Sequence, residues 1–148
     1  MLTVIQALLV ALLALAGEVK DATKYPALHP VHAALQEAGV PIDLWVDFTA
    51  VAACESEFIN DASGDSGLAQ GLFQIHWYLW APWAEDNEWG VFDEPYDMVQ
   101  NARLAYLIGE RYSIPRGRDR WDQWSVEPWP VCKNKASKLV EMHYGVFD

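Results

Sequence analysis

One carboxylate in this sequence stands where the pattern calls for an apolar side chain. Leu44, Phe48 and Val51 recur at steps of four and three residues, which is the spacing of one face of a helix. The next position on that face is Glu55. A carboxyl group on the core-facing side of a helix is expensive to ionise, so it tends to keep its proton near neutral pH. Such a group suits glycosidic cleavage, because the leaving sugar oxygen must be protonated as the bond breaks.

Two ordinary roles for Glu55 compete with this interpretation. The side chain can turn outward into solvent, or it can pair with a basic residue such as Arg103, and acids in unusual positions often have such structural roles. Either arrangement would leave an ionised carboxylate at neutral pH, with no proton to donate.

A glycosidase that uses water needs a second carboxylate near the acid. The separation is about 6.5–9.5 Å in inverting enzymes and about 5–5.5 Å in retaining ones. Asp61 and Asp65 are the candidates, although both lie in a Gly/Ser-rich loop where Asp is a common turn residue. If neither reaches the cleft, Glu55 must act twice. It would then take a proton from the substrate's own 6-hydroxyl group as that oxygen closes onto the anomeric carbon, which gives an anhydro sugar.

No metal site and no organic cofactor are expected. The residues from Asp61 onward resemble the start of an EF-hand calcium loop. Leu72, however, stands at the twelfth position, where that loop needs a bidentate Glu. His29 and His32 are too few ligands for a zinc site. The sequence also lacks the glycine-rich loops that cradle phosphates.

The segments before and around Glu55 are expected to be helices joined by loops. Pro30 suits the first turn of a short helix, and Gly39 suits its C-terminal cap. Asp43 is expected to cap the helix that carries Glu55. Residues 60–71 are rich in Gly, Ser and Asp and predict a loop or a small hairpin.

The second half of the chain also favours helices. Residues 82–95 are expected to be irregular, because they contain two prolines and many acids. Asp97 and Gln100 resemble a capping box that opens a helix through about Tyr112. Asn134 is expected to cap a last helix. With no alternating strand pattern in view, the sequence predicts a mainly α fold.

Length and composition indicate one folded domain. The chain has 148 residues, of which 52% are hydrophobic and 21% charged, so it is too apolar for a disordered protein. The formal net charge of −11 argues against nucleic acid as a partner, because nucleic-acid binders use clustered basic residues.

The beginning of the sequence looks like an export signal. Residues 2–16 are rich in Leu and Ala and end in Ala14-Leu15-Ala16, the small-x-small pattern of a cleavage site, although no Lys or Arg precedes them. This run is shorter than the roughly 20 residues that a membrane-spanning helix needs. We expect a signal peptide at residues 1–16, with an uncleaved signal anchor or an amphipathic helix as alternatives, and a linker at 17–29. We therefore expect a secreted or cell-envelope protein. The even number of cysteines, two, suits the oxidising conditions outside the cytoplasm.

Three short strings together resemble a known superfamily. They are ACES at 53–56, GLFQ at 71–74 and WPVC at 129–132, with the glycine-containing loop between the first two. This combination resembles the catalytic segment of the lysozyme-like superfamily, and more narrowly the soluble lytic transglycosylase and resuscitation-promoting-factor domains. The resemblance spans roughly residues 43–132. It implies a lysozyme-like domain at 30–148, mainly α and of the α+β class, and a disulfide between Cys54 and Cys132.

The resemblance also implies roles for individual residues. Glu55 would be the general acid/base and Gln74 would lie on the wall of the cleft. Trp80 and Trp124 would be flat platforms for sugar rings, although a Trp is as often part of a core. Asn101 falls where such domains have an Asn near the substrate or positioning a helix, and it is equally suited to an ordinary first helical turn.

The implied activity is cleavage of the β-1,4 bond between N-acetylmuramic acid and N-acetylglucosamine in peptidoglycan. The enzyme would be a lytic transglycosylase or a hydrolytic lysozyme, and a monomer that acts on glycan strands. Its negative charge should slow its encounter with an anionic polymer. The alternative is a non-catalytic glycan-binding module, or a structural module of a phage particle, on the same fold.

Overall fold

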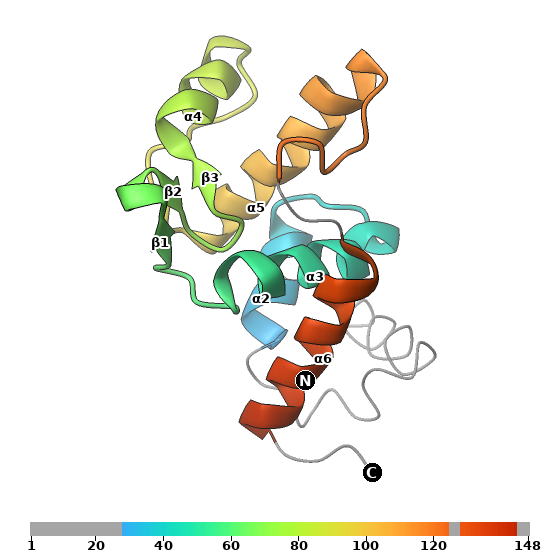
Figure 1. Cartoon of the computed structure of the whole chain (residues 1–148). Helices are drawn as coiled ribbons and strands as arrows, with labels where there is room; N and C mark the ends of the chain where they lie inside the picture. Colours follow the sequence, from blue (N-terminus) through green and yellow to red (C-terminus); the bar gives the residue numbers. More distant parts are fainter. Residues whose placement is uncertain (1–27, 125–127, 145–148) are drawn as a thin grey trace.

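The computed structural model describes residues 28–124 and 128–144, which form a mainly helical structure with one small antiparallel sheet (Figure 1). The expected export signal lies outside these residues, as does most of the expected linker. The α-helices are α2 (Leu28–Glu37), α3 (Trp45–Ser56), α4 (Trp77–Asp86), α5 (Met98–Leu107) and α6 (Lys133–Tyr144). The strands are β1 (Ser63–Gly64), β2 (Ala69–Gln70) and β3 (Ile75–His76), in the order β1-β2-β3. Shorter turns are the 3₁₀ segments Ile42–Leu44, Asp65–Gly67 and Ile114–Arg116 and the π-helical segments Ile108–Ser113 and Pro128–Cys132.

Helix α3 is the buried centre of this arrangement, with α2 and α6 beside it (Figure 1). Its middle residues, 48–53, are all buried, and the alanines among them let neighbouring elements approach closely. Phe48 packs edge-on against Phe73 and Trp121, with ring centroids 5.5 and 4.7 Å apart. The helix that carries Glu55 is therefore held by the core along most of its length.

Several of the expected elements are confirmed. A helix spans residues 28–37, and Gly39 follows it with a left-handed φ of 80°, although α2 begins two residues before the expected domain boundary at residue 30. The Asp97 side chain accepts a hydrogen bond of 2.8 Å from the Gln100 backbone N–H, as expected for an N-cap. The loop at 60–71 does form a hairpin, in which Ser63 pairs with Gln70 and Gly64 with Ala69.

Two of the expected helix caps are wrong. Asp43 lies inside the 3₁₀ turn Ile42–Leu44, and α3 begins only after it, with no side-chain cap. The start of α3 is secured instead by the buried Trp45 indole, which donates a hydrogen bond of 2.7 Å to the Val40 carbonyl. Asn134 is not a cap either, because the chain is already helical through Pro128–Cys132 when α6 begins at Lys133.

The expectation of irregular structure from Pro82 onward is also wrong in its first part. Helix α4 runs through Pro82 to Asp86, and the irregular stretch begins after it. Proline removes a backbone hydrogen bond to the carbonyl four residues earlier, here that of Tyr78, a residue that is 62% exposed and open to water. Burial of Trp77, Ala81 and Ala84 on the other side of α4 outweighs that loss.

Two further features were not expected. Strand β3, which pairs with β2, was not predicted because two residues are too few for an alternating pattern. The helix opened by Asp97 becomes π-helical at Ile108–Ser113, so its end differs from the regular helix expected through Tyr112.

Candidate active site

A cavity of about 460 Å³ opens beside the C-terminal end of α3. Its wall is built from α3, the hairpin, the start of α4, the π-helical turn after α5, and residues 123–124. The four residues that the sequence singled out for acid/base chemistry and sugar binding all line it: Glu55, Gln74, Trp80 and Trp124. Residues that lie up to 69 positions apart in the chain are therefore brought to one place.

Glu55 lies half-buried on this wall, near the end of α3. The pKa of its carboxyl group is raised from 4.5 to about 7, first by burial and then by the negative charge of Asp65, while the positive charge of Lys135 opposes both effects. The alternative pairing with Arg103 does not occur, because that guanidinium group is directed to the Glu37 carbonyl, 3.5 Å away. A large fraction of Glu55 therefore carries a proton at neutral pH.

Of the two candidate second carboxylates, Asp65 lines the cavity and Asp61 does not. An oxygen of Asp65 lies 2.8 Å from Nε2 of His76, which also lines the cavity. The Asp65 side chain is nevertheless 67% exposed. Asp65 and Ser66 both have left-handed backbones, with φ of 48° and 57°, a conformation that is uncommon for such residues and tends to gather at functional sites.

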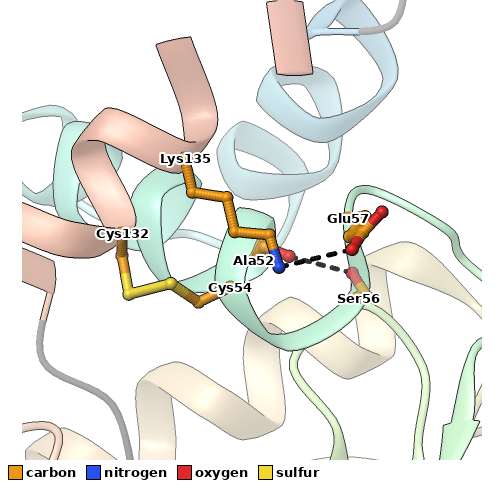
Figure 2. Close-up of a disulfide and its surroundings, with 6 residues drawn as sticks. All are labelled: Ala52, Cys54, Ser56, Glu57, Cys132 and Lys135. Carbon is orange, nitrogen blue, oxygen red and sulfur yellow. Dashed lines mark hydrogen bonds and ion pairs between the residues drawn. A yellow bond between two sulfur atoms is a disulfide. The ribbon is translucent and has the colours of Figure 1, made fainter. Parts of the chain in front are cut away.

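The other charge near Glu55 comes from α6 and sits beside the disulfide between Cys54 and Cys132 (Figure 2). The two Cα atoms are 5.3 Å apart, and the bond ties α3 to the turn that leads into α6. Figure 2 shows Lys135 reaching from α6 toward the end of α3, where its ammonium group lies 3.3 Å from a Glu57 carboxylate oxygen. The disulfide therefore secures the helix that places a positive charge near Glu55.

Gln74 does more than line the cavity wall. Its side-chain N–H groups donate hydrogen bonds of 2.9 Å to the carbonyls of Ala62 and Gly71, so it ties the hairpin loop together. Its backbone is left-handed, with φ of 49°. A Cβ atom on Gly64 would lie 2.7 Å from the Gln74 amide oxygen, so a larger residue at position 64 would have to displace the Gln74 amide.

The two tryptophans are each partly packed and partly on the wall. The Trp124 indole N–H donates a hydrogen bond of 2.8 Å to the Phe73 carbonyl, and its ring meets Trp121 edge-on. Trp80 packs edge-on against Trp83 and Tyr112, with centroids 5.2 and 4.9 Å apart. Both are half-buried, so their inner edges belong to the core while another part of each borders the cavity.

Asn101 is a positioning residue that sequence reasoning left outside the site. It is fully buried on α5, and its amide oxygen accepts a hydrogen bond of 2.8 Å from the Phe73 N–H. Its amide nitrogen donates to the carbonyls of Gln70 and Pro95, at 3.0 and 2.9 Å. Asn101 thereby holds the turn between β2 and β3 that presents Gln74. The capping box placed it in a first helical turn, but nothing in the local sequence indicated what its side chain would contact.

Across the ranges 28–124 and 128–144, no group of three or more His, Cys, Asp or Glu side chains is arranged to hold a metal ion. In the same ranges, no helix has the length and apolar character that a membrane crossing needs.

Comparison with known proteins yields no match, whether to family models, to curated proteins or to solved structures. The chemistry of the cavity must therefore be argued from its own residues.

Proposed function

We propose that this protein cleaves the β-1,4 bond between N-acetylmuramic acid and N-acetylglucosamine in peptidoglycan, with Glu55 as general acid and base. The observation that carries the proposal is a half-buried carboxyl group, with a pKa of about 7, on the wall of a cavity that two tryptophans also line. A pKa near the working pH suits a group that must first give and then take a proton. Flat aromatic surfaces suit the C–H faces of sugar rings.

In the proposed reaction, the Glu55 carboxyl group gives its proton to the glycosidic oxygen as the bond to the anomeric carbon breaks. The resulting carboxylate then takes the proton from the 6-hydroxyl group of the same N-acetylmuramic acid residue. That oxygen forms the new bond to the anomeric carbon, which closes a 1,6-anhydro ring. Atoms and charge balance without water, and Glu55 ends the cycle protonated. The step draws on no metal or organic cofactor.

Asp65 is the residue that decides between this route and hydrolysis. A nucleophile or water-activating base should have its carboxylate directed at the substrate and shielded from bulk water. Asp65 is two-thirds exposed, and one of its oxygens lies against His76, so a role as a charged neighbour of Glu55 fits it better. Mass spectrometry of the released fragments tests this choice, since anhydro ends support the transglycosylase and reducing ends the hydrolytic lysozyme.

Asp65→Asn is expected to move the alkaline limb of the pH–activity profile to lower pH. Activity falls where Glu55 loses its proton, and the negative charge of Asp65 raises the pKa of that carboxyl group. Without this charge, Glu55 ionises at lower pH. Lys135→Met is expected to move the limb the opposite way, because the Lys135 charge lowers the same pKa. The measurement is the rate of turbidity loss of purified cell walls as a function of pH.

Asp61→Asn is the matched control, since Asp61 is in the same loop but does not line the cavity. Its profile should coincide with that of the wild type. Equal profiles for all three variants would contradict the assignment of Glu55 as the titrating group. Loss of nearly all activity in Asp65→Asn at every pH would show instead that Asp65 acts on the substrate, as a hydrolase requires.

The competing proposal is a glycan-binding module or a structural module of a phage particle, in which Glu55 performs no chemistry. It predicts that the wild type binds cell walls without clearing them. For either role we propose a secreted or cell-envelope location, or carriage by a phage particle, because peptidoglycan lies outside the cytoplasm.

A further inference from the structure

A short path of side chains leads from the cavity wall to an arginine outside the cavity lining. Trp80 lines the cavity, and Tyr112 meets it edge-on with ring centroids 4.9 Å apart. The guanidinium carbon of Arg116 lies 3.9 Å from the centroid of the Tyr112 ring. We call Trp80, Tyr112 and Arg116 the stem path.

The backbone places these residues through unusual local structure. Tyr112 belongs to the π-helical turn Ile108–Ser113, and the first residue of that turn, Ile108, also lines the cavity. π-Helical turns are rare and often occur at functional sites. Arg116 follows in the 3₁₀ turn Ile114–Arg116, which ends at Gly117 with φ of 71°. The segment after α5 and the helix α4 that carries Trp80 rise on the same side of the molecule (Figure 1).

The Arg116 side chain is held in a fixed orientation, but no carboxylate of the described residues neutralises its charge. One of its Nη atoms donates a hydrogen bond of 2.8 Å to the Tyr112 carbonyl, which fixes the side chain over the ring. It forms no ion pair with any carboxylate of residues 28–124 and 128–144, and it is exposed. A guanidinium group has five N–H donors in a planar fork that matches a carboxylate. Most of these donors therefore remain available.

An arginine with free N–H donors stands out among the charges that surround Arg116. The protein carries a net charge of −11, yet residues 111–120 contain four of its ten Lys and Arg residues. Two of those four are paired, Arg118 with Asp122 and Arg120 with Glu110. Arg111 lies over Trp89, close in sequence to the acidic Glu88. Arg116 is thus the cation of this segment that reaches the cavity wall by the shorter path, through Tyr112 alone, whereas Arg111 reaches Trp80 through Trp89 and Trp83.

We propose that the stem path binds the peptide stem of peptidoglycan, with Arg116 pairing with one of its carboxylates. This inference rests on the proposed function, because it assumes that a sugar of the glycan strand occupies the cavity. The peptide is joined to the N-acetylmuramic acid residue, so it leaves the strand beside the bond that Glu55 would cleave. In an intact strand the lactyl carboxyl group is bound to the peptide, and the free carboxylates are those of the stem. The path would select strands that still carry peptides.

The test is isothermal titration calorimetry with Glu55→Gln protein, which should bind without cleaving. Three ligands are compared: a disaccharide fragment that carries its peptide, the same fragment without peptide, and a neutral chitooligosaccharide. Adding Arg116→Gln is expected to weaken binding of the peptide-bearing fragment by about tenfold, which corresponds to one charge-assisted hydrogen-bonded pair. Binding of the other two ligands should stay within about twofold, since a change that small is below 0.5 kcal/mol. Arg118→Gln, whose partner is Asp122, is the matched control and should leave all three affinities unchanged.

Each outcome points to one conclusion. If Arg116→Gln behaves like Arg118→Gln, the stem path does not bind the peptide. If Arg116→Gln weakens the peptide-free fragment as much as the peptide-bearing one, the partner is the lactyl carboxylate and the inference is wrong. If Glu55→Gln protein with Arg116 intact binds none of the three ligands, the proposed function itself fails.

Discussion

Glu55→Gln is expected to reduce the rate of cell-wall clearing by about 10²–10⁴-fold, the usual contribution of a general acid and base. Glutamine keeps the shape of the side chain but has no proton that it can give to the glycosidic oxygen. Asp65, the other carboxylate among the described residues that line the cavity, is two-thirds exposed, so Glu55 is the buried acid of this wall. Turbidity loss of purified walls, followed for both proteins at equal concentration, measures the effect.

Glu57→Gln provides the same chemical change two residues further along the chain. Glu57 is exposed and pairs with Lys135 outside the cavity lining, so this variant should retain activity within about threefold, as expected for a weak surface pair. If Glu55→Gln clears walls as fast as the wild type, Glu55 is not the proton donor. If the wild type binds walls and neither protein clears them, the binding-module proposal replaces the enzymatic one.

Removal of the disulfide by the double change Cys54→Ser and Cys132→Ser is expected to lower the free energy of unfolding by about 4 kcal/mol. The bond joins residues 78 positions apart, so it removes a large loop-closure entropy from the unfolded chain. That amount is a large share of the roughly 5–15 kcal/mol by which most domains are stable. Urea unfolding of the oxidised wild type and of the double variant, at the same pH, measures the difference.

Wild-type protein treated with a thiol reductant is the control for the two serine substitutions. It should unfold at nearly the same urea concentration as the double variant, and the reductant should not affect the variant itself. A difference below about 1 kcal/mol between oxidised and reduced protein would contradict a stabilising role, because it lies far below the loop-entropy value.

The parts of the site that could be predicted are those with a local signal. Glu55 interrupts an apolar helical stripe, and an interruption of that kind is visible in the sequence alone. The Asp97 cap was also predicted, because the side chain and the backbone N–H that it accepts from are only three residues apart. The common cavity of Glu55, Gln74, Trp80 and Trp124 was expected from a family resemblance and not from spacing.

The parts that could not be predicted depend on contacts between distant residues. Asn101 holds a turn around 30 residues before it in the chain, and Lys135 reaches Glu57 from a helix that follows 78 positions later. His76 meets Asp65 because two short strands fold back on each other, and neither strand is long enough to show a pattern. Helix α4 continues through Pro82 because burial of Trp77 and Ala84 overrides a local preference.

The proton on Glu55 can be observed without any substrate. In protein labelled with ¹³C at the glutamate side-chain carboxyl carbons, NMR spectra recorded over a pH series report the titration of each carboxyl group, and Glu55→Gln identifies the signal of interest. The signal that disappears in this variant is predicted to titrate at about 7, because the group is half-buried and lies near the charge of Asp65. Titration near the ordinary value of 4.5 would mean that Glu55 is an ionised carboxylate at neutral pH, and the proposed proton transfer could not occur.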